Sequence, residues 1–178
     1  MTQATSILKG QKMVTGLFTD RDSAERAFLV ALGRGYDKGE ISVVMDDDTR
    51  QKYFPAEEAD KTELAGKAAE GELGSPKSGT MATLFTAAAA VGAFLLLPGL
   101  GLVLAGPVAA ALAGAGAAAV AGGLYGALHD WGIPQQRIDA YDAAIKRGGI
   151  LLGVKARNDD DARYFDEQWR AIGAEYVD

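Results

Sequence analysis

The sequence predicts an α+β domain with four strands in one antiparallel sheet, interrupted by a long apolar segment. Two observations lead to this prediction. Short apolar runs alternate with segments of helical periodicity in both terminal parts of the chain. Between them, residues 78–128 contain no Asp, Glu, Lys or Arg, so all 42 charged residues (18 basic and 24 acidic) lie in 1–77 and 130–178.

Residues 1–48 are expected to form a strand, a helix and a second strand. The apolar run 13–18 predicts the first strand, and Asp20 is placed to cap the helix that follows. Gly33 and Gly35 end that helix, and a second strand follows over 41–45. Asp46, Asp47 and Asp48 end the second strand with charges that a sheet interior would not accept.

Residues 49–77 are expected to link the two parts of the domain. Glu57/Lys61 and Glu63/Lys67 have the i,i+4 spacing and order that favour a solvated helix over about 56–69. Disorder is the alternative. The apolar side of this helix is mostly Ala, which predicts weak docking onto the rest of the molecule.

Residues 132–178 return to an ordinary globular pattern. A helix with one apolar face leads into the apolar run 150–156, which is expected to be a central strand. Asn158 or Asp159 is placed to cap a last helix, and 175–177 are expected to form a short final strand. This order of elements suits the ferredoxin-like plan, a four-stranded antiparallel sheet with helices on one face.

The charge-free run is predicted to form an Ala/Gly-rich helical hairpin over 78–131. Its first arm, 80–97, would span ~27 Å as a helix, close to the ~30 Å core of a bilayer. Its second arm runs from Pro107 to about His129. The residues that break the run and predict the turn are Pro98, Gly99, Gly106 and Pro107.

Each arm has a thin face of small residues, as in glycine zippers, and such faces let helix backbones approach closely. These faces are the candidate sites of helix packing and oligomerisation. They consist of Ala82, Thr86, Ala89 and Ala93 on the first arm, and Ala115, Ala119, Gly122 and Gly126 on the second.

Three environments could bury so much apolar chain: a bilayer, neighbouring copies of the protein, or the protein's own core. The other 127 residues offer little surface for it, which favours a bilayer or a homo-oligomer over a monomeric core. Tyr125, His129 and Trp131 end the run and are candidate anchors at a membrane interface.

Composition excludes several functions. A net charge of −6 argues against nucleic-acid binding, and the absence of Cys with a single His excludes thiolate and multi-His metal sites. The Asp46–Asp48 and Asp159–Asp161 runs could bind cations, but the predicted topology separates them and caps explain them more simply. No glycine run completes a phosphate-binding loop. We therefore expect no metal, no cofactor and no enzymatic activity.

Several short motifs, in this order, resemble the bacterial general-stress or heat-induced stress protein family, a group described mainly as a domain of unknown function. The matching residues are Val14–Phe18, Ala24-Glu25, Ala27, Gly35-Tyr36 and Ile41–Val43, and, after the hairpin, Gly132-Ile133-Pro134, Tyr141 and Gly148–Leu152. The resemblance covers roughly residues 13–156. It implies a cytoplasmic role in stress and no catalytic residues.

The sequence therefore predicts a non-enzymatic stress-response protein that attaches to the cytoplasmic side of the membrane through its hairpin and associates with itself. The absence of a secretory signal pattern agrees with this location. One alternative is a soluble assembly, such as a ring, tubule or shell, with hairpins packed between subunits. A second alternative is a module that binds a small ligand on its sheet.

Overall fold

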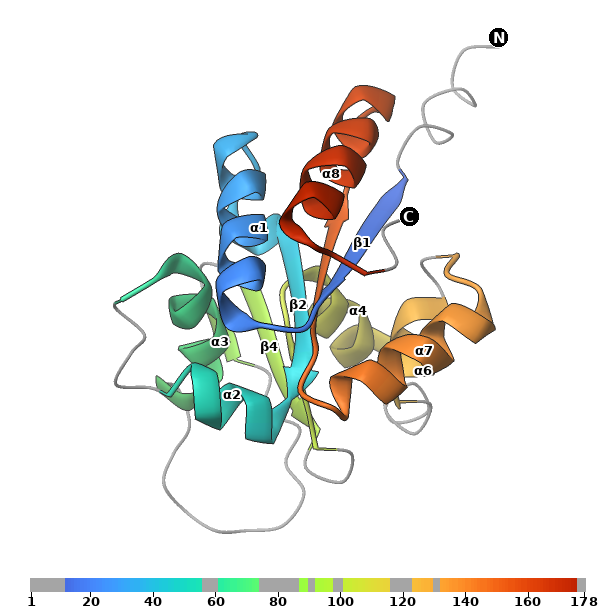
Figure 1. Cartoon of the computed structure of the whole chain (residues 1–178). Coiled ribbons are helices and arrows are strands. Elements are labelled where there is room, and N and C mark those ends of the chain that lie inside the picture. The colour runs from blue at the N-terminus through green and yellow to red at the C-terminus, as the bar shows by residue number, and fades with distance from the viewer. Residues whose placement is uncertain are drawn as a thin grey trace, which may run out of the picture.

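The computed structural model describes residues 12–55, 61–73, 87–89, 92–97, 101–115, 123–129 and 132–175. Figure 1 shows its helices and strands. In chain order they are β1 (Met13–Phe18), α1 (Arg21–Gly33), the 3₁₀ turn η2 (Lys38–Glu40), β2 (Ile41–Asp46), α2 (Asp47–Tyr53), α3 (Glu63–Leu73), β3 (Ala87–Ala89), β4 (Gly92–Leu97), β5 (Leu102–Ala105), α4 (Pro107–Ala115), α6 (Gly123–His129), α7 (Gln135–Ile145), β6 (Ile150–Lys155) and α8 (Asp159–Ile172).

The strands form one six-stranded sheet in the order β1-β6-β2-β5-β4-β3. Every neighbouring pair is antiparallel. Glu175 adds an antiparallel bridge to Leu17 on β1, with backbone hydrogen bonds of 3.0 and 2.8 Å. The molecule therefore has the mixed α+β class that the sequence predicts, with β6 between β1 and β2.

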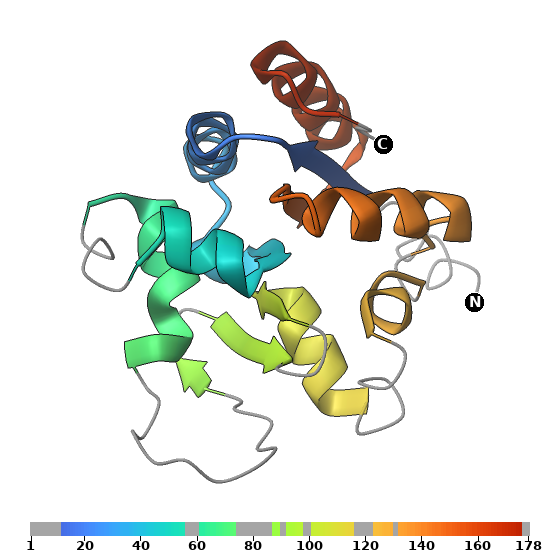
Figure 2. The same ribbon diagram turned by 60° about the horizontal axis from the view of Figure 1, so that its bottom comes forward.

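Helices cover both faces of the sheet (Figure 2). Between the sheet and the helices of each face lies an apolar core. On one face, β1, β2, β5 and β6 pack against α1, α3 and α8. On the other face, the alternate side chains of the same strands pack against α4, α6 and α7. The alternation is clear in β5, where Val103 belongs to the first core and Leu104 to the second.

The predicted caps hold three helix N-termini in place. Asp20 accepts a hydrogen bond from the backbone amide of Ser23 at the start of α1. Asn158 accepts one from the amide of Asp161 at the start of α8. Asp46 ends β2 and caps α2, so the first acidic run supplies a cap as well as a strand end. These contacts satisfy amides that a helix leaves without an internal partner.

The helical first arm predicted for 80–97 is wrong over its described part, because residues 87–89 and 92–97 are strands. The six residues of β4, GAFLLL, are continuously apolar, and a short run of this kind is compatible with a buried strand as well as a helix. The structure extends β2 with β5 and then β4, so the free edge of the sheet selects the strand.

Two further expectations need correction. The helices do not share one face, because α7 lies on the face opposite α1 and α8. The charged linker also docks firmly, since Leu64, Ala65 and Ala68 of α3 are at most 1% exposed. Small alanine side chains let α3 approach its neighbours closely, and one leucine supplies the larger apolar contact.

Candidate functional site

The charge-free segment is only partly available to an external partner. Leu102 and Leu104 of β5 and Val108 and Leu112 of α4 are at most 3% exposed. They pack with α7 in the second core, which includes Tyr141. The expectation that the rest of the chain could not bury this segment is therefore wrong for these residues, because the segment brings its own strands and helix to the sheet.

The structure describes two of the four predicted turn residues. Gly106 follows β5 in the left-handed conformation, with φ +84°, and Pro107 is the first residue of α4. A strand therefore leads into a helix at this point, where we predicted the end of a turn between two helical arms. Pro98 and Gly99 lie outside the described residues.

The thin faces predicted for the two arms are not brought together as helix surfaces in the described residues. Ala89 lies in β3 and Ala93 in β4, so they occupy paired strands instead of one helical face. Ala115 is the last residue of α4, and Gly126 lies in the middle of α6. The remaining members lie outside the described residues: Ala82, Thr86, Ala119 and Gly122.

Among the residues of the segment whose exposure the structure describes, the exposed ones lie on α4 and α6, two helices that pack against each other. Ala110 and Ala111 of α4 are exposed, and so are Tyr125 and His129 of α6. Tyr125 is 40% exposed, and its ring centroid lies 5.2 Å from that of His129. We call these four residues the α4–α6 surface. The third predicted anchor, Trp131, lies outside the described residues.

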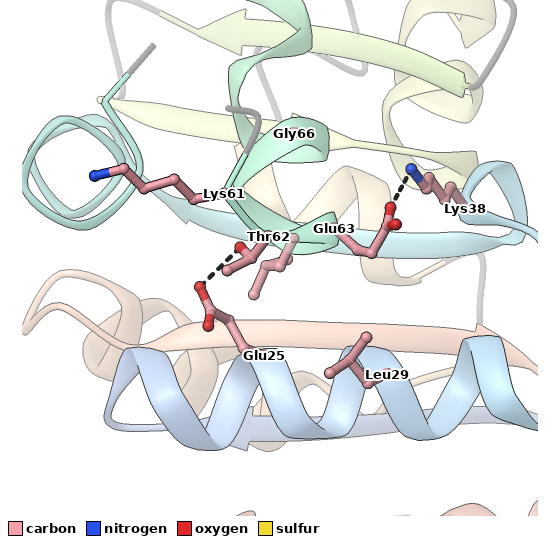
Figure 3. Close-up of a pocket in the computed structure, with 8 residues that line it drawn as sticks. Glu25, Leu29, Lys38, Lys61, Thr62, Glu63 and Gly66 are labelled. Carbon is pink, nitrogen blue, oxygen red and sulfur yellow. Dashed lines mark hydrogen bonds and ion pairs between the residues drawn. The ribbon is translucent and has the colours of Figure 1, made fainter. Parts of the chain in front are cut away.

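A cavity of about 460 Å³ opens between α1, η2 and the start of α3 (Figure 3). The Thr62 hydroxyl donates a 2.9 Å hydrogen bond to Glu25, which also accepts one of 2.8 Å from Arg21. Lys38 forms an ion pair with Glu63. The cavity's two carboxylates are thus engaged by neighbouring side chains, and both interactions tie α3 to the rest of the molecule.

A polar cluster joins the end of α1 to the start of α8. The Tyr36 hydroxyl donates to Asp161 over 2.7 Å and accepts from the backbone amide of Arg157 over 2.9 Å. Arg34 donates to the other oxygen of Asp161 over 2.8 Å. The Arg157 guanidinium lies 4.1 Å from the centroid of the Tyr36 ring.

The cluster shifts the pKa of both buried groups. Burial, and next the hydrogen bond to Asp161, raise the pKa of Tyr36 to about 12. The Tyr36 hydrogen bond holds the pKa of Asp161 below its ordinary value, against the desolvation that raises it, and Arg34 adds to the lowering. The neutral phenol and the ionised carboxylate therefore stabilise each other, which is a structural role.

The two acidic runs lie at opposite ends of the sheet. β2 and β6 are antiparallel, with Ile41 opposite Val154, so Asp46 at the end of β2 is remote from Asp159 beyond β6. Across the part of the chain that the structure describes, no three His, Cys, Asp or Glu residues are grouped to hold a metal ion. The same part contains no helix that is both long and apolar enough to cross a membrane.

One buried side chain of α3 escaped the sequence interpretation. Lys67 of α3 is 1% exposed, although its Glu63/Lys67 spacing suggested a solvated surface pair. Leu64, three residues earlier and therefore on the same side of the helix, was the signal that could have placed Lys67 on a buried side.

Comparison with known proteins adds no assignment, because the chain matches no protein-family model, no curated protein and no solved structure.

Proposed function

We propose that this chain is a non-enzymatic protein that associates with further copies of itself through its charge-free segment, residues 78–128. The observation that carries the proposal is the division of burial within the segment. Leu104 and Leu112 complete the molecule's own core, whereas Ala111 and Tyr125 face solvent. Charged residues are depleted and aromatic residues enriched in the core of a protein interface, and this exposed surface shares both features.

The pairing order supports a ferredoxin-like assignment for the half of the sheet that lies outside this segment. Glu175, β1, β6 and β2 follow one another in antiparallel order, as the four strands of that plan would. In this assignment β5, β4, β3 and α4 are an insertion after the second strand that extends the sheet. The insertion then brings the charge-free segment to one side of the molecule.

The other polar features support a binding role over catalysis. The carboxylates of the cavity and of the Tyr36–Asp161 cluster accept hydrogen bonds from side chains that hold helices together. The resemblance to stress proteins adds a cellular context for self-association and assigns no reaction.

Membrane attachment on the cytoplasmic side is the second candidate. The exposed Tyr125–His129 pair at the end of the uncharged run favours it, because such residues are common at membrane interfaces. The net charge of −6 opposes it, since anionic lipid repels an acidic protein. We therefore rank association between copies first.

Sedimentation velocity without detergent tests the proposal. We expect the wild-type chain to form species larger than a monomer. Ala111→Glu should weaken the association by about tenfold or more, because a carboxylate would be buried without a partner. Ala171→Glu is the matched control, since Ala171 is exposed on α8 outside the charge-free segment. A wild-type chain that remains monomeric at every concentration contradicts the proposal.

Flotation with phosphatidylcholine vesicles separates the second candidate from the first. Self-association predicts that the protein stays with the aqueous fraction. A chain that is monomeric without vesicles and floats with them, while Ala111→Glu no longer floats, would replace association between copies by membrane attachment.

A further inference from the structure

Two large apolar side chains stay exposed among the residues that the structure describes. Leu29 is 53% exposed and Tyr125 is 40% exposed. Leu29 lies on α1, which packs on one face of the sheet together with α3 and α8. Tyr125 lies on α6, which packs on the opposite face together with α4 and α7. Because the sheet separates the two side chains, they cannot cover each other within one molecule.

Leu29 lies in the cavity between α1 and the start of α3. Figure 3 shows its side chain pointing from α1 toward that helix, and Leu64 of α3 also lines the cavity. The cavity volume of about 460 Å³ falls within the range of ~300–1,000 Å³ that is usual for pockets that bind small ligands. The cavity therefore has the space and the apolar lining to receive one aromatic side chain.

The polar lining of the cavity suits an occupant that is neutral and carries a hydroxyl group. The lining contains two Glu and two Lys side chains, so its charges sum to zero and require no counter-charge. Glu25 accepts hydrogen bonds from Thr62 and Arg21, and both end on its Oε1 atom. Its Oε2 atom can therefore accept the proton of a hydroxyl group that enters the cavity.

We infer that Tyr125 of one copy of the chain occupies the Leu29 cavity of a second copy. The tyrosine ring covers Leu29, and its hydroxyl donates a hydrogen bond to Glu25, as a buried phenol requires a partner. Tyrosine is among the side chains that most often anchor a protein interface by filling a pocket. The rest of the α4–α6 surface contains no Asp, Glu, Lys or Arg, so it brings no charge that the cavity would leave unpaired.

This contact joins two different surfaces of the chain, on opposite faces of the sheet. Each copy then offers one Tyr125 and one cavity, so association continues from copy to copy until a ring closes or a filament forms. A symmetric contact between two α4–α6 surfaces would instead stop at a dimer and leave Leu29 in water. The inference rests on the proposed function, because it names the site that the associating surface binds.

Sedimentation velocity of two single variants tests the two sides of the contact. Leu29→Glu places a carboxylate in the cavity beside Glu25, and Tyr125→Ala removes the ring that fills the cavity. We expect each variant to associate at least about tenfold more weakly than the wild type. Ala171→Glu is the control for the added charge, because Ala171 is exposed on α8 and does not line the cavity. If Leu29→Glu associates as strongly as this control, the inference is overturned and the proposed function stands.

An equimolar mixture of the two variants shows whether both are folded and complementary. Leu29→Glu keeps an intact Tyr125, and Tyr125→Ala keeps an intact cavity, so each pair of chains can form one contact. We expect a complex of one chain of each variant and no larger species. A mixture that stays monomeric, as the separate variants do, overturns the inference. If the wild type itself remains monomeric, the proposed function fails and the inference fails with it.

Discussion

At the scale of single residues, Gly106 shows how closely the charge-free segment is fitted to the sheet. Its φ of +84° is a conformation that side chains rarely adopt, and a Cβ atom there would lie 2.3 Å from the carbonyl oxygen of Ile41. The same residue joins β5 to Pro107 at the start of α4. Gly106 therefore lets the chain turn sharply from β5, which pairs with β2, into α4, which packs on one face of the sheet.

Gly106→Ala is expected to lower the free energy of unfolding by about 2–4 kcal/mol, since both the backbone conformation and the close approach to Ile41 oppose a methyl group. Urea unfolding measures the effect. Gly33→Ala, at the end of α1, is the control, because no atom lies within 4 Å of its added Cβ. A Gly106 variant as stable as the control would contradict the observed approach to β2.

At the scale of elements, the polar cluster around Tyr36 fixes how the two helices of one layer meet. Asp161 lies in the first turn of α8, and Arg34 follows the last turn of α1. Phe165 extends the contact with a ring centroid 5.1 Å from that of Tyr36. The ionised carboxylate of Asp161 and the neutral phenol of Tyr36 thereby link the start of α8 to the end of α1. Each group favours the protonation state of the other through their hydrogen bond.

The pKa of Tyr36, raised from 10.0 to about 12, predicts a loss of stability in alkali. The fold favours the neutral phenol, so its contribution is complete below pH 10 and is lost as the pH rises to 12. At pH 8, Tyr36→Phe should be less stable than the wild type by about 1–2 kcal/mol, because its hydrogen bonds are gone. At pH 11 this difference should shrink by about 1 kcal/mol. Urea unfolding at both values measures it, and a constant difference would contradict the shifted pKa.

Asp161 makes the cluster lose stability in acid, as Tyr36 does in alkali. Its pKa is lowered in the fold, so the stability that it contributes is present above the ordinary carboxyl pKa and is lost as the pH falls below it. The cluster therefore supports the α1–α8 contact throughout the range between these limits, which includes neutral pH.

At the scale of the whole molecule, the described part of the charge-free segment belongs to the fold. Val44 of β2 and Leu151 of β6 share their core with Leu104 and Val108 from the segment. If the segment were a separate membrane hairpin, the two globular parts would have to cover that face of the sheet without it. In the structure, β5 and α4 cover it.

Replacement of residues 78–128 by a short Gly/Ser linker is expected to abolish cooperative unfolding. The deletion would expose apolar side chains of β2, β6 and α7 that the segment buries, a loss far greater than the usual margin of stability. Calorimetry of the deleted chain measures this. A cooperative transition near that of the wild type would show instead that the segment is an independent appendage.

The sequence was informative where local patterns decide the structure. The apolar runs 13–18 and 150–156 marked β1 and β6. Asp20, and Asn158 or Asp159, marked helix starts, because a cap and its amide lie within a few residues of each other. The antiparallel β2–β6 pairing, with the acidic runs at opposite ends, also followed from the order of elements.

The roles of the apolar run and of the linker were decided only by tertiary structure. β4 is apolar enough for either a helix or a strand, and its pairing with β5, which in turn pairs with β2, makes it a strand. Lys67 has the spacing of a surface residue, yet it is only 1% exposed in α3. The amino-acid order thus determined which residues avoid water. Only the tertiary structure determined which parts of the chain bury them, because that packing depends on residues far away in the sequence.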